Sequence, residues 1–434
     1  MSKRYNLKVA INVVVANMIG TGIFTTLGFQ VAPNAIPDIF TILFIWSLGG
    51  ILALCGATCY IEIATAFKEN GGEYTFLRKL YHPILGIASG VVSLISGFSA
   101  AIAGLALAAG EYLKPIFGSD NAVYVSVALL TFVFLFQTLG VLLGGYIQVF
   151  FTGIKVLTVV VIIALPIFFQ TESGYNPDFT LLPTPQTLSF LFSYQSANAL
   201  IWVMFAYSGW NAAIYITENL TDPIKNLPKA LIYGTVFVMV IYLMVNISIM
   251  YSVPFSKISG VVDVANVVAH QYAGDWGSLI YSILVSISLL AGMNAMFISG
   301  SRVFQKMAVD FRLPKIFSGE TFNGSLVSAS FFVYAIALFF VVFANFQTTI
   351  EFVGITLTLY SSLVVFGVFL IRRKNGEYSH RIKAIGYPLS PILFLVGAFW
   401  MFSFCVTENP MSLIYSLLPL FPASLIYYFT EYRS

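Results

Sequence analysis

Two short segments that contain glycine interrupt long apolar stretches of the sequence. The first is residues 17–24 (NMIGTGIF), and the second is residues 205–211 (FAYSGWN). Because glycine destabilises a helix interior by about 1 kcal/mol relative to alanine, a helix can unwind at either segment. Close packing of membrane helices on small residues is the alternative explanation for one such segment alone. Two interruptions at matching depth favour two broken helices.

An unwound turn inside a bilayer would bind ions through its backbone. It leaves N–H groups at the start of one half-helix and C=O groups at the end of the other without intrahelical partners, which is costly in lipid unless they meet a ligand. The N-terminal end favours a carboxylate, and the C-terminal end favours an ammonium group. The two segments therefore predict a site for the zwitterion of a free amino acid, made without charged side chains.

Lys155 is the charge that lies deepest in an apolar stretch. It stands eight residues into the stretch 147–169, which contains no acidic residue. A lysine at the centre of a membrane helix costs about 2.5–3.5 kcal/mol, so a functional role is the first interpretation. The alternative is that its four-carbon stem reaches back over about 12 Å to the cytoplasmic interface.

The composition predicts an all-α membrane protein. Of 434 residues, 59% are hydrophobic and only 9% are charged, whereas a soluble domain has about 25% charged residues. This excludes a soluble enzyme, a disordered chain and a disulfide scaffold, and the net charge of +3 argues against a nucleic-acid partner. Cys55 and Cys59 share a helix face as small apolar residues, and the three histidines lack metal-ligand spacing. We expect no catalytic residue, metal or cofactor.

Twelve apolar stretches can cross a bilayer, which takes about 20 residues. They cover residues 9–32, 38–62, 84–112, 122–143, 147–169, 193–217, 229–251, 276–301, 327–346, 350–371, 388–406 and 411–430. No signal-peptide cleavage site follows the first stretch, so we expect it to be retained. With the N-terminus in the cytoplasm, only Lys114 and Lys257 of the 21 basic residues fall in outer loops. This asymmetry predicts a multi-pass plasma-membrane protein with both termini cytoplasmic.

The two interruptions fall in the first and sixth stretches. Spans one to five and six to ten would then be corresponding halves, and an odd number of spans reverses their direction, so the repeat must be inverted. We therefore expect a 5+5 inverted repeat. Its units would be residues 1–170 and 171–374, followed by two further spans in 375–434.

Several motifs resemble those of the amino acid–polyamine–organocation superfamily. Residues 20–24 (GTGIF) resemble its G-[ST]-G-I-F signature. Glu62 and residues 71–78 resemble its first cytoplasmic loop. Residues 205–211, followed by Glu218 and residues 226–230 (NLPKA), are most similar to the L-type amino acid transporter branch. The motifs cover spans one to eight, and the resemblance extends to the later spans by topology only.

This resemblance implies a LeuT-type fold with the substrate between helices one and six. Thr21, Gly22 and Ile23 would bind the substrate carboxylate, and carbonyl groups around Met18 and of Phe205 and Ser208 would bind the ammonium group; Phe205 would also be the aromatic gate. The resemblance further implies that Lys155 replaces the sodium ion of sodium-coupled relatives. It would bridge the inner half of helix one to helix eight, with Ser286 or Ser288 as its partner.

The expected function is sodium-independent transport of neutral L-amino acids by alternating access, as an exchanger or a facilitator. Neutral substrates are expected because no charged side chain is placed to pair with a charged substrate. A proton-coupled symporter with Lys155 as the titrating group is the near alternative, and a membrane-embedded enzyme or a channel is the alternative of another class. Animal L-type relatives pair with a glycoprotein through a cysteine after span three. Residues 114–121 contain none, so no covalent glycoprotein subunit is expected.

Overall fold

The computed structural model describes residues 5–32, 36, 38–67, 72–138, 141–169, 175, 182–311, 326–373, 381–408 and 410–429. Within these ranges, the side chains of residues 119, 141–150, 218, 219, 412 and 415 are not described. Gly71 and the side chain of Glu218 lie outside the described residues. So do seven of the basic residues used for the orientation: Lys3, Arg4, Lys68, Arg312, Lys315, Lys374 and Arg433.

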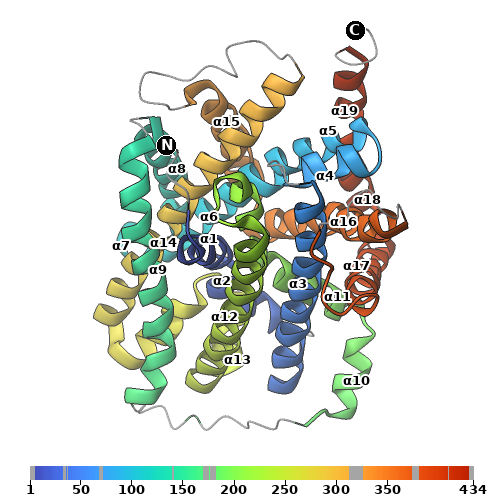
Figure 1. Ribbon diagram of the computed structural model, residues 1–434. Helices are drawn as coiled ribbons and strands as arrows, with labels where there is room; N and C mark the ends of the chain where they lie inside the picture. The colour runs from blue at the N-terminus through green and yellow to red at the C-terminus, as the bar shows by residue number, and fades with distance from the viewer. Residues whose placement is uncertain are drawn as a thin grey trace.

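The described residues are almost entirely helical (Figure 1). The elements are α1 (Leu7–Met18), α2 (Gly22–Gln30), α3 (Ile39–Phe67), α4 (Gly72–Leu80), α5 (Pro83–Val92), the π-helix η1 (Ser93–Ala100), α6 (Ala101–Tyr112), α7 (Lys114–Phe117), η2 (Ser119–Asn121), α8 (Ala122–Thr138), α9 (Val141–Phe168), α10 (Pro185–Leu191), α11 (Tyr194–Ala206), η3 (Ala212–Asn219), α12 (Pro223–Ser252), α13 (Phe255–Ile258), α14 (Val264–Asp310), α15 (Val327–Phe343), α16 (Phe346–Arg373), α17 (Leu389–Glu408), α18 (Met411–Leu417) and α19 (Leu420–Tyr427). This confirms the predicted all-α class.

Among the described residues, eight helical segments are long and apolar enough to cross a membrane. A ninth crossing is possible if α10 and α11, which bend by 73° at their junction, form one span. The apolar helices α8 and α15 are shorter, with 17 residues each. The count of twelve spans therefore stays a prediction.

Two predicted spans differ from the helices observed. The stretch 276–301 is part of the much longer α14, which bends at Gly274. The stretch 411–430 contains two short helices, α18 and α19, instead of one, and Pro419 lies at their junction. Proline has no N–H and clashes with the preceding turn, so it ends a helix that hydropathy alone would continue.

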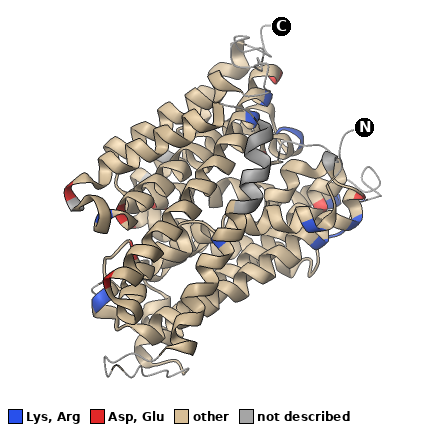
Figure 2. Ribbon diagram, turned by 90° about the vertical axis from the view of Figure 1, so that its left-hand side faces the viewer, with Lys and Arg blue, Asp and Glu red and all other residues tan. Residues whose placement is uncertain are grey.

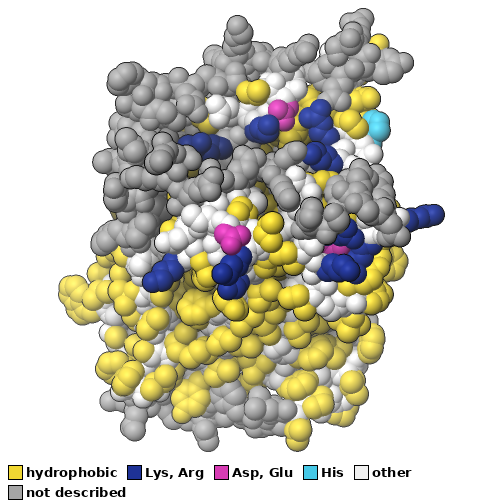
Figure 3. Space-filling view, in the orientation of Figure 1, with side chains coloured by type: hydrophobic (Ala, Val, Ile, Leu, Met, Phe, Trp, Pro, Cys, Tyr) yellow, Lys and Arg dark blue, Asp and Glu magenta, His cyan; other side chains and the backbone are white. Residues whose placement is uncertain are grey.

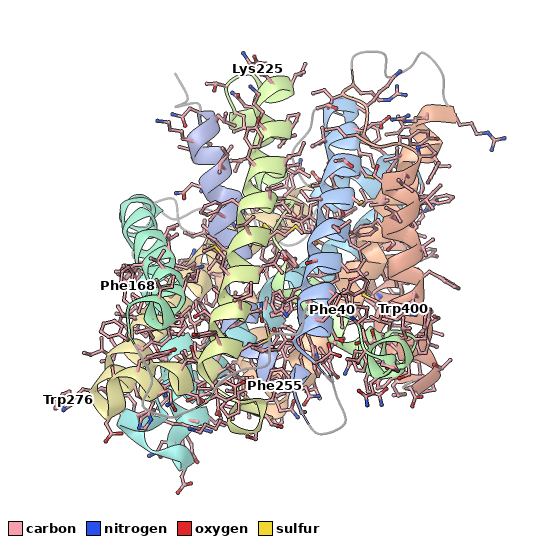
Figure 4. The ribbon with its side chains drawn as sticks, turned by 90° about the horizontal axis from the view of Figure 1, so that it is seen from below. Phe40, Phe168, Lys225, Phe255, Trp276 and Trp400 are labelled. Atoms are coloured by element: carbon pink, nitrogen blue, oxygen red, sulfur yellow. The ribbon has the colours of Figure 1, made fainter. Side chains whose placement is uncertain are left out.

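The long helices pack into one bundle. Helix α12 lies beside α3 and α1, while α14 packs against α9 and α6. Lys225 and Phe255 lie near opposite ends of α12 (Figure 4). Charged residues concentrate near helix ends (Figure 2), and a broad hydrophobic band covers the face below the visible Lys and Arg side chains (Figure 3). Elsewhere among the described residues, large apolar side chains such as Phe168 and Phe399 are about three-quarters exposed, as expected of lipid-facing residues.

A buried ion cluster joins α3 to the end of α16. The Glu62 carboxylate, which is fully buried, accepts hydrogen bonds from Arg372 Nε and Nη2 (2.9 and 2.8 Å) and from Arg381 Nε (2.9 Å). The backbone N–H of Ala384 also donates to it at 2.8 Å. One carboxylate therefore holds together α3, α16 and the segment that precedes α17.

At the other end of α3, Asp38 joins this helix to α10. Its carboxylate accepts hydrogen bonds from the backbone N–H and hydroxyl of Thr41, both at 2.7 Å, and from the hydroxyls of Thr187 (2.7 Å) and Thr184 (3.2 Å). Burial raises the pKa of the Asp38 carboxyl, but the hydrogen bonds from Thr41, Thr187 and Thr184 outweigh this effect. Together they hold its pKa below the ordinary value of 3.8.

We expect Glu62→Gln to lower the thermal stability of the detergent-solubilised protein. The substitution keeps the size of the side chain but leaves Arg372 and Arg381 facing each other without a negative charge. Removing one partner of a buried ion pair costs about 3–5 kcal/mol. Melting followed by size-exclusion chromatography measures the loss. Glu408→Gln, at an exposed position, is the matched control, and equal melting temperatures for the two variants would contradict the role of Glu62.

We expect the effect of Asp38→Asn on stability to depend on pH. A lowered pKa in the folded state means that the carboxylate stabilises the protein above its unfolded-state pKa, and that this contribution disappears as the pH falls through the folded-state pKa. The variant should therefore melt earlier than the parent at neutral pH and converge with it in acid. Melting temperatures of both proteins between neutral and acidic pH test this, and a difference that does not change with pH would count against it.

Candidate functional site

The first span is interrupted where the sequence predicts it. Helix α1 ends at Met18 and α2 begins at Gly22, and Ile19 between them has extended backbone angles (φ −70°, ψ 97°). In the first turn of α2, the Phe24 N–H donates to the Thr21 carbonyl at 2.9 Å, and no preceding helical turn supplies partners for the N–H groups of Gly22 and Ile23. A Cβ atom added to Gly20 would make only an ordinary van der Waals contact, with the Met18 carbonyl oxygen at 3.9 Å.

The sixth predicted span is also broken. Helix α11 ends at Ala206, and the 3-10 helix η3 begins at Ala212. Between them Gly209 has φ +94°, a conformation that favours glycine. The predicted break in residues 205–211 is therefore confirmed.

The two breaks touch each other. A Cβ atom on Gly209 would lie 2.9 Å from the carbonyl carbon and oxygen of Asn17, and one on Gly22 would lie 2.5 Å from the Cα of Ala206. Only glycine allows these close approaches between backbones. The tertiary fold thus brings together the segments that contain Met18, Thr21, Gly22 and Ile23 on one side and Phe205 and Ser208 on the other.

The predicted site residues differ in exposure. Met18, Thr21, Gly22 and Ile23 are buried. Phe205 is 8% exposed in the last turn of α11, and Ser208 is half-buried. The Phe205 carbonyl accepts a hydrogen bond from the Ser208 N–H at 2.9 Å, so one of its two lone pairs is used within the turn.

Tyr242 of α12 lies at the junction of the breaks, and the sequence analysis did not identify it. Its hydroxyl is 2.5 Å from the Met18 carbonyl oxygen and 3.0 Å from that of Ala206. Because a hydroxyl has one proton, it can donate to only one of these carbonyls at a time. The Met18 carbonyl, predicted to face the ammonium group, thus already has a protein donor. Its position in an apolar stretch could have pointed to this tyrosine, but many of the 24 tyrosines share that feature.

Lys155 is buried between the first span and α14. It is 2% exposed, and its Nζ donates a hydrogen bond to the Ala16 carbonyl oxygen in α1 at 3.0 Å. A Cβ on Gly292 of α14 would lie 3.6 Å from the same Nζ. The burial argues against the alternative in which the side chain reaches back to the interface. Lys155 therefore lies beside α1 and α14, the helices that the resemblance implies it bridges, and its role in place of sodium stays a prediction.

The predicted partner of Lys155 on α14 is wrong. The hydroxyls of Ser286 and Ser288 are buried and have no hydrogen-bond partner among the described residues. The lysine instead meets α14 at Gly292, more than one helical turn further along. Sequence spacing gives the position of a residue along its own helix, but it does not say which residue of a neighbouring helix lies opposite.

The site holds few ionisable groups. Residues 17–24 and 205–211 contain no charged side chain. In the described part of the chain, no group of three or more His, Cys, Asp or Glu residues could hold a metal ion. The arrangement therefore offers backbone dipoles, hydroxyl groups and one buried ammonium group, which suits binding of a small zwitterion.

Comparison with known proteins agrees with this arrangement. Residues 6–429 match the amino acid permease family. The chain is 26% identical to the Serine/threonine exchanger SteT of Bacillus subtilis (strain 168), over 96% of this chain and 94% of that protein. It is 25% identical to the b(0,+)-type amino acid transporter 1 of Mus musculus, over 99% and 88% of the two chains, and 26% identical to the Large neutral amino acids transporter small subunit 2 of the same species, over 93% and 76%. The chain therefore belongs to the amino acid permease family, within the amino acid–polyamine–organocation superfamily, and is a multi-pass membrane transporter of amino acids and not an enzyme.

Proposed function

We propose that this protein is a sodium-independent exchanger or facilitator of neutral L-amino acids that works by alternating access. The observation that carries the proposal is the direct contact between the two broken helices, Gly22 against Ala206 and Gly209 against Asn17. Their half-helix ends supply opposite partial charges at one place. Thr21, Gly22 and Ile23 would bind the carboxylate, and carbonyl groups around Met18 and of Phe205 and Ser208 would bind the ammonium group.

Lys155 supports the sodium-independent part of the proposal. Its ammonium group is buried and bonded to the Ala16 carbonyl, so it supplies a fixed positive charge beside the end of α1. A second cation next to it would be repelled. The buried amine also makes a proton-coupled symporter the second candidate, since Lys155 could release and recover a proton during the cycle.

Neutral substrates fit the absence of charged side chains from residues 17–24 and 205–211. Two of the relatives have names that specify serine and threonine or large neutral amino acids as substrates. We further propose twelve spans in the units 1–170, 171–374 and 375–434, with both termini on the cytoplasmic side of the plasma membrane. Because residues 114–121 contain no cysteine, we propose that the protein works without a covalently attached glycoprotein subunit.

We expect purified protein in proteoliposomes to catalyse counterflow of labelled neutral L-amino acids. Uptake should saturate with substrate concentration, as it does for a carrier, and should be equal in sodium and choline buffers. A panel of twenty amino acids, tested with and without a proton gradient, separates the candidates. Dependence on sodium would refute the proposal, and dependence on the proton gradient would favour the symporter.

We expect Lys155→Ala to reduce transport strongly while the protein still inserts into the membrane. A hydrogen bond to a charged group contributes about 1.5–3 kcal/mol, which corresponds to a loss of about tenfold to a hundredfold. Counterflow rates, normalised to the amount of monodisperse protein, measure the loss. Lys257→Ala removes an exposed lysine and is the control. Near-normal uptake by Lys155→Ala would eliminate the proposed role of this residue.

A further inference from the structure

One buried carboxylate lies outside the site described so far. Glu73, in the first turn of α4, is 8% exposed. Its oxygens accept hydrogen bonds from Asn211 Nδ2 at 2.6 Å, from the Tyr215 hydroxyl at 2.6 Å and from the Tyr60 hydroxyl at 3.1 Å. All three donors are neutral, and the ion pairs formed between described residues do not include Glu73. A buried charge is costly, so this arrangement needs an explanation.

Two of the donors belong to the broken sixth span. Asn211 is the last residue of the break, and Tyr215 lies in η3, the helix that follows it. The neighbouring Gly72 makes room for the Tyr215 ring, because a Cβ atom there would lie 2.4 Å from the ring carbon Cε1. Gly72 therefore accommodates the ring of Tyr215, and Glu73 binds its hydroxyl.

The unwound turn is held from two sides. Gly209 lies directly against the backbone of Asn17 in the first break. Two residues later, Asn211 donates to Glu73, and between them Trp210 packs edge-on against Tyr60 with ring centroids 4.7 Å apart. The position of residues 209–211 thus depends on α1 at one end and on Glu73 at the other.

Helix α4 is attached at the same time to helices that are not broken at this site. The hydroxyl of Tyr74, the next residue, donates to Asp310 Oδ2 of α14 at 2.9 Å. The hydroxyl of Tyr81, just after α4, donates to the Leu363 carbonyl of α16 at 2.6 Å. Through Glu73, α4 therefore connects the break in the sixth span to α14 and α16.

We propose that Glu73 is a positioning residue of the transport cycle: it holds Asn211 and Tyr215 against α4, so η3 can separate from α4 only when these hydrogen bonds break. This inference rests on the proposed function, in which residues around Ser208 hold the substrate ammonium group. Glu73 does not touch the substrate. It sets the position of the turn that does, and it opposes opening on the side where α4 lies.

The first test uses transport kinetics. Glu73→Gln keeps the size of the side chain but removes its negative charge and replaces one acceptor oxygen by a donor, so the hydrogen bonds to Asn211, Tyr215 and Tyr60 become weaker. We expect kcat for counterflow to change by about tenfold while KM changes by less than about twofold, because the substrate contacts remain. Tyr215→Phe, which removes one hydroxyl, should change kcat in the same direction by a smaller factor, and Glu73→Asp should restore part of the parental rate. Glu408→Gln, an exposed matched change, should stay within about twofold of the parent.

The second test does not depend on transport. Ser208→Cys is introduced into a protein whose three native cysteines are replaced by alanine, and labelling by a membrane-impermeant maleimide is measured in inside-out membrane vesicles. We expect Glu73→Gln and Tyr215→Phe each to increase the labelling rate about threefold or more, since weaker bonds favour the open state. Glu408→Gln should leave the rate unchanged.

The outcomes separate this inference from the proposed function. Unchanged kcat and unchanged labelling in both Glu73→Gln and Tyr215→Phe would overturn the role of Glu73. If Glu73→Gln is not monodisperse in size-exclusion chromatography, both tests are made with Tyr215→Phe, because its ring can still pack against Gly72. If the parent carries no amino acid but labelling responds to the variants, the proposed function fails while the positioning role of Glu73 stands.

Discussion

The structure depends on one constraint: backbone N–H and C=O groups inside a membrane must find partners within the protein or in a ligand. Breaking two helices in the middle of the bundle creates unpaired backbone groups, and nearby residues supply partners for some of them. The breaks lie against each other, Tyr242 reaches the carbonyls of Met18 and Ala206, and Lys155 binds that of Ala16. The protein therefore supplies partners for part of each break itself.

Because the chain has few charges, each buried one has an identifiable position. Lys155 places its ammonium group between α1 and α14. Glu62 joins α3 to Arg372 of α16 and to Arg381, and Glu73 joins α4 to the broken sixth span. A charge that is paired or hydrogen-bonded in a low-dielectric interior fixes geometry strongly, since its partner cannot be replaced by water. Lys155 and Glu73 thus connect the broken helices to the helices around them, while Glu62 connects α3 to α16 and to the segment before α17.

The structure differs from the predictions made from the sequence where two helices meet. Hydropathy located the helices, and glycine located both breaks within a few residues. Burial of Lys155 and its neighbours α1 and α14 were also predicted, the latter from the family resemblance. The partner on α14 was wrong, because Ser286 and Ser288 lie at another level than Gly292, which faces the lysine. Tyr242 and the contacts of Glu73 were missed, since neither a tyrosine inside a helix nor a glutamate near a helix end has a spacing that reveals its partner.

The sequence by itself determined the membrane environment, the helical class and the two points of interruption, because these follow from local properties: apolar length, scarcity of charge and the low helix propensity of glycine. The tertiary structure alone decided which surfaces face each other. Residues far apart in the chain are joined by contacts such as Gly209 against Asn17, Tyr242 between two carbonyls and the hydrogen bond from Asn211 to Glu73. They depend on the rotation and level of each helix in the bundle, which packing between helices sets and which no single helix encodes.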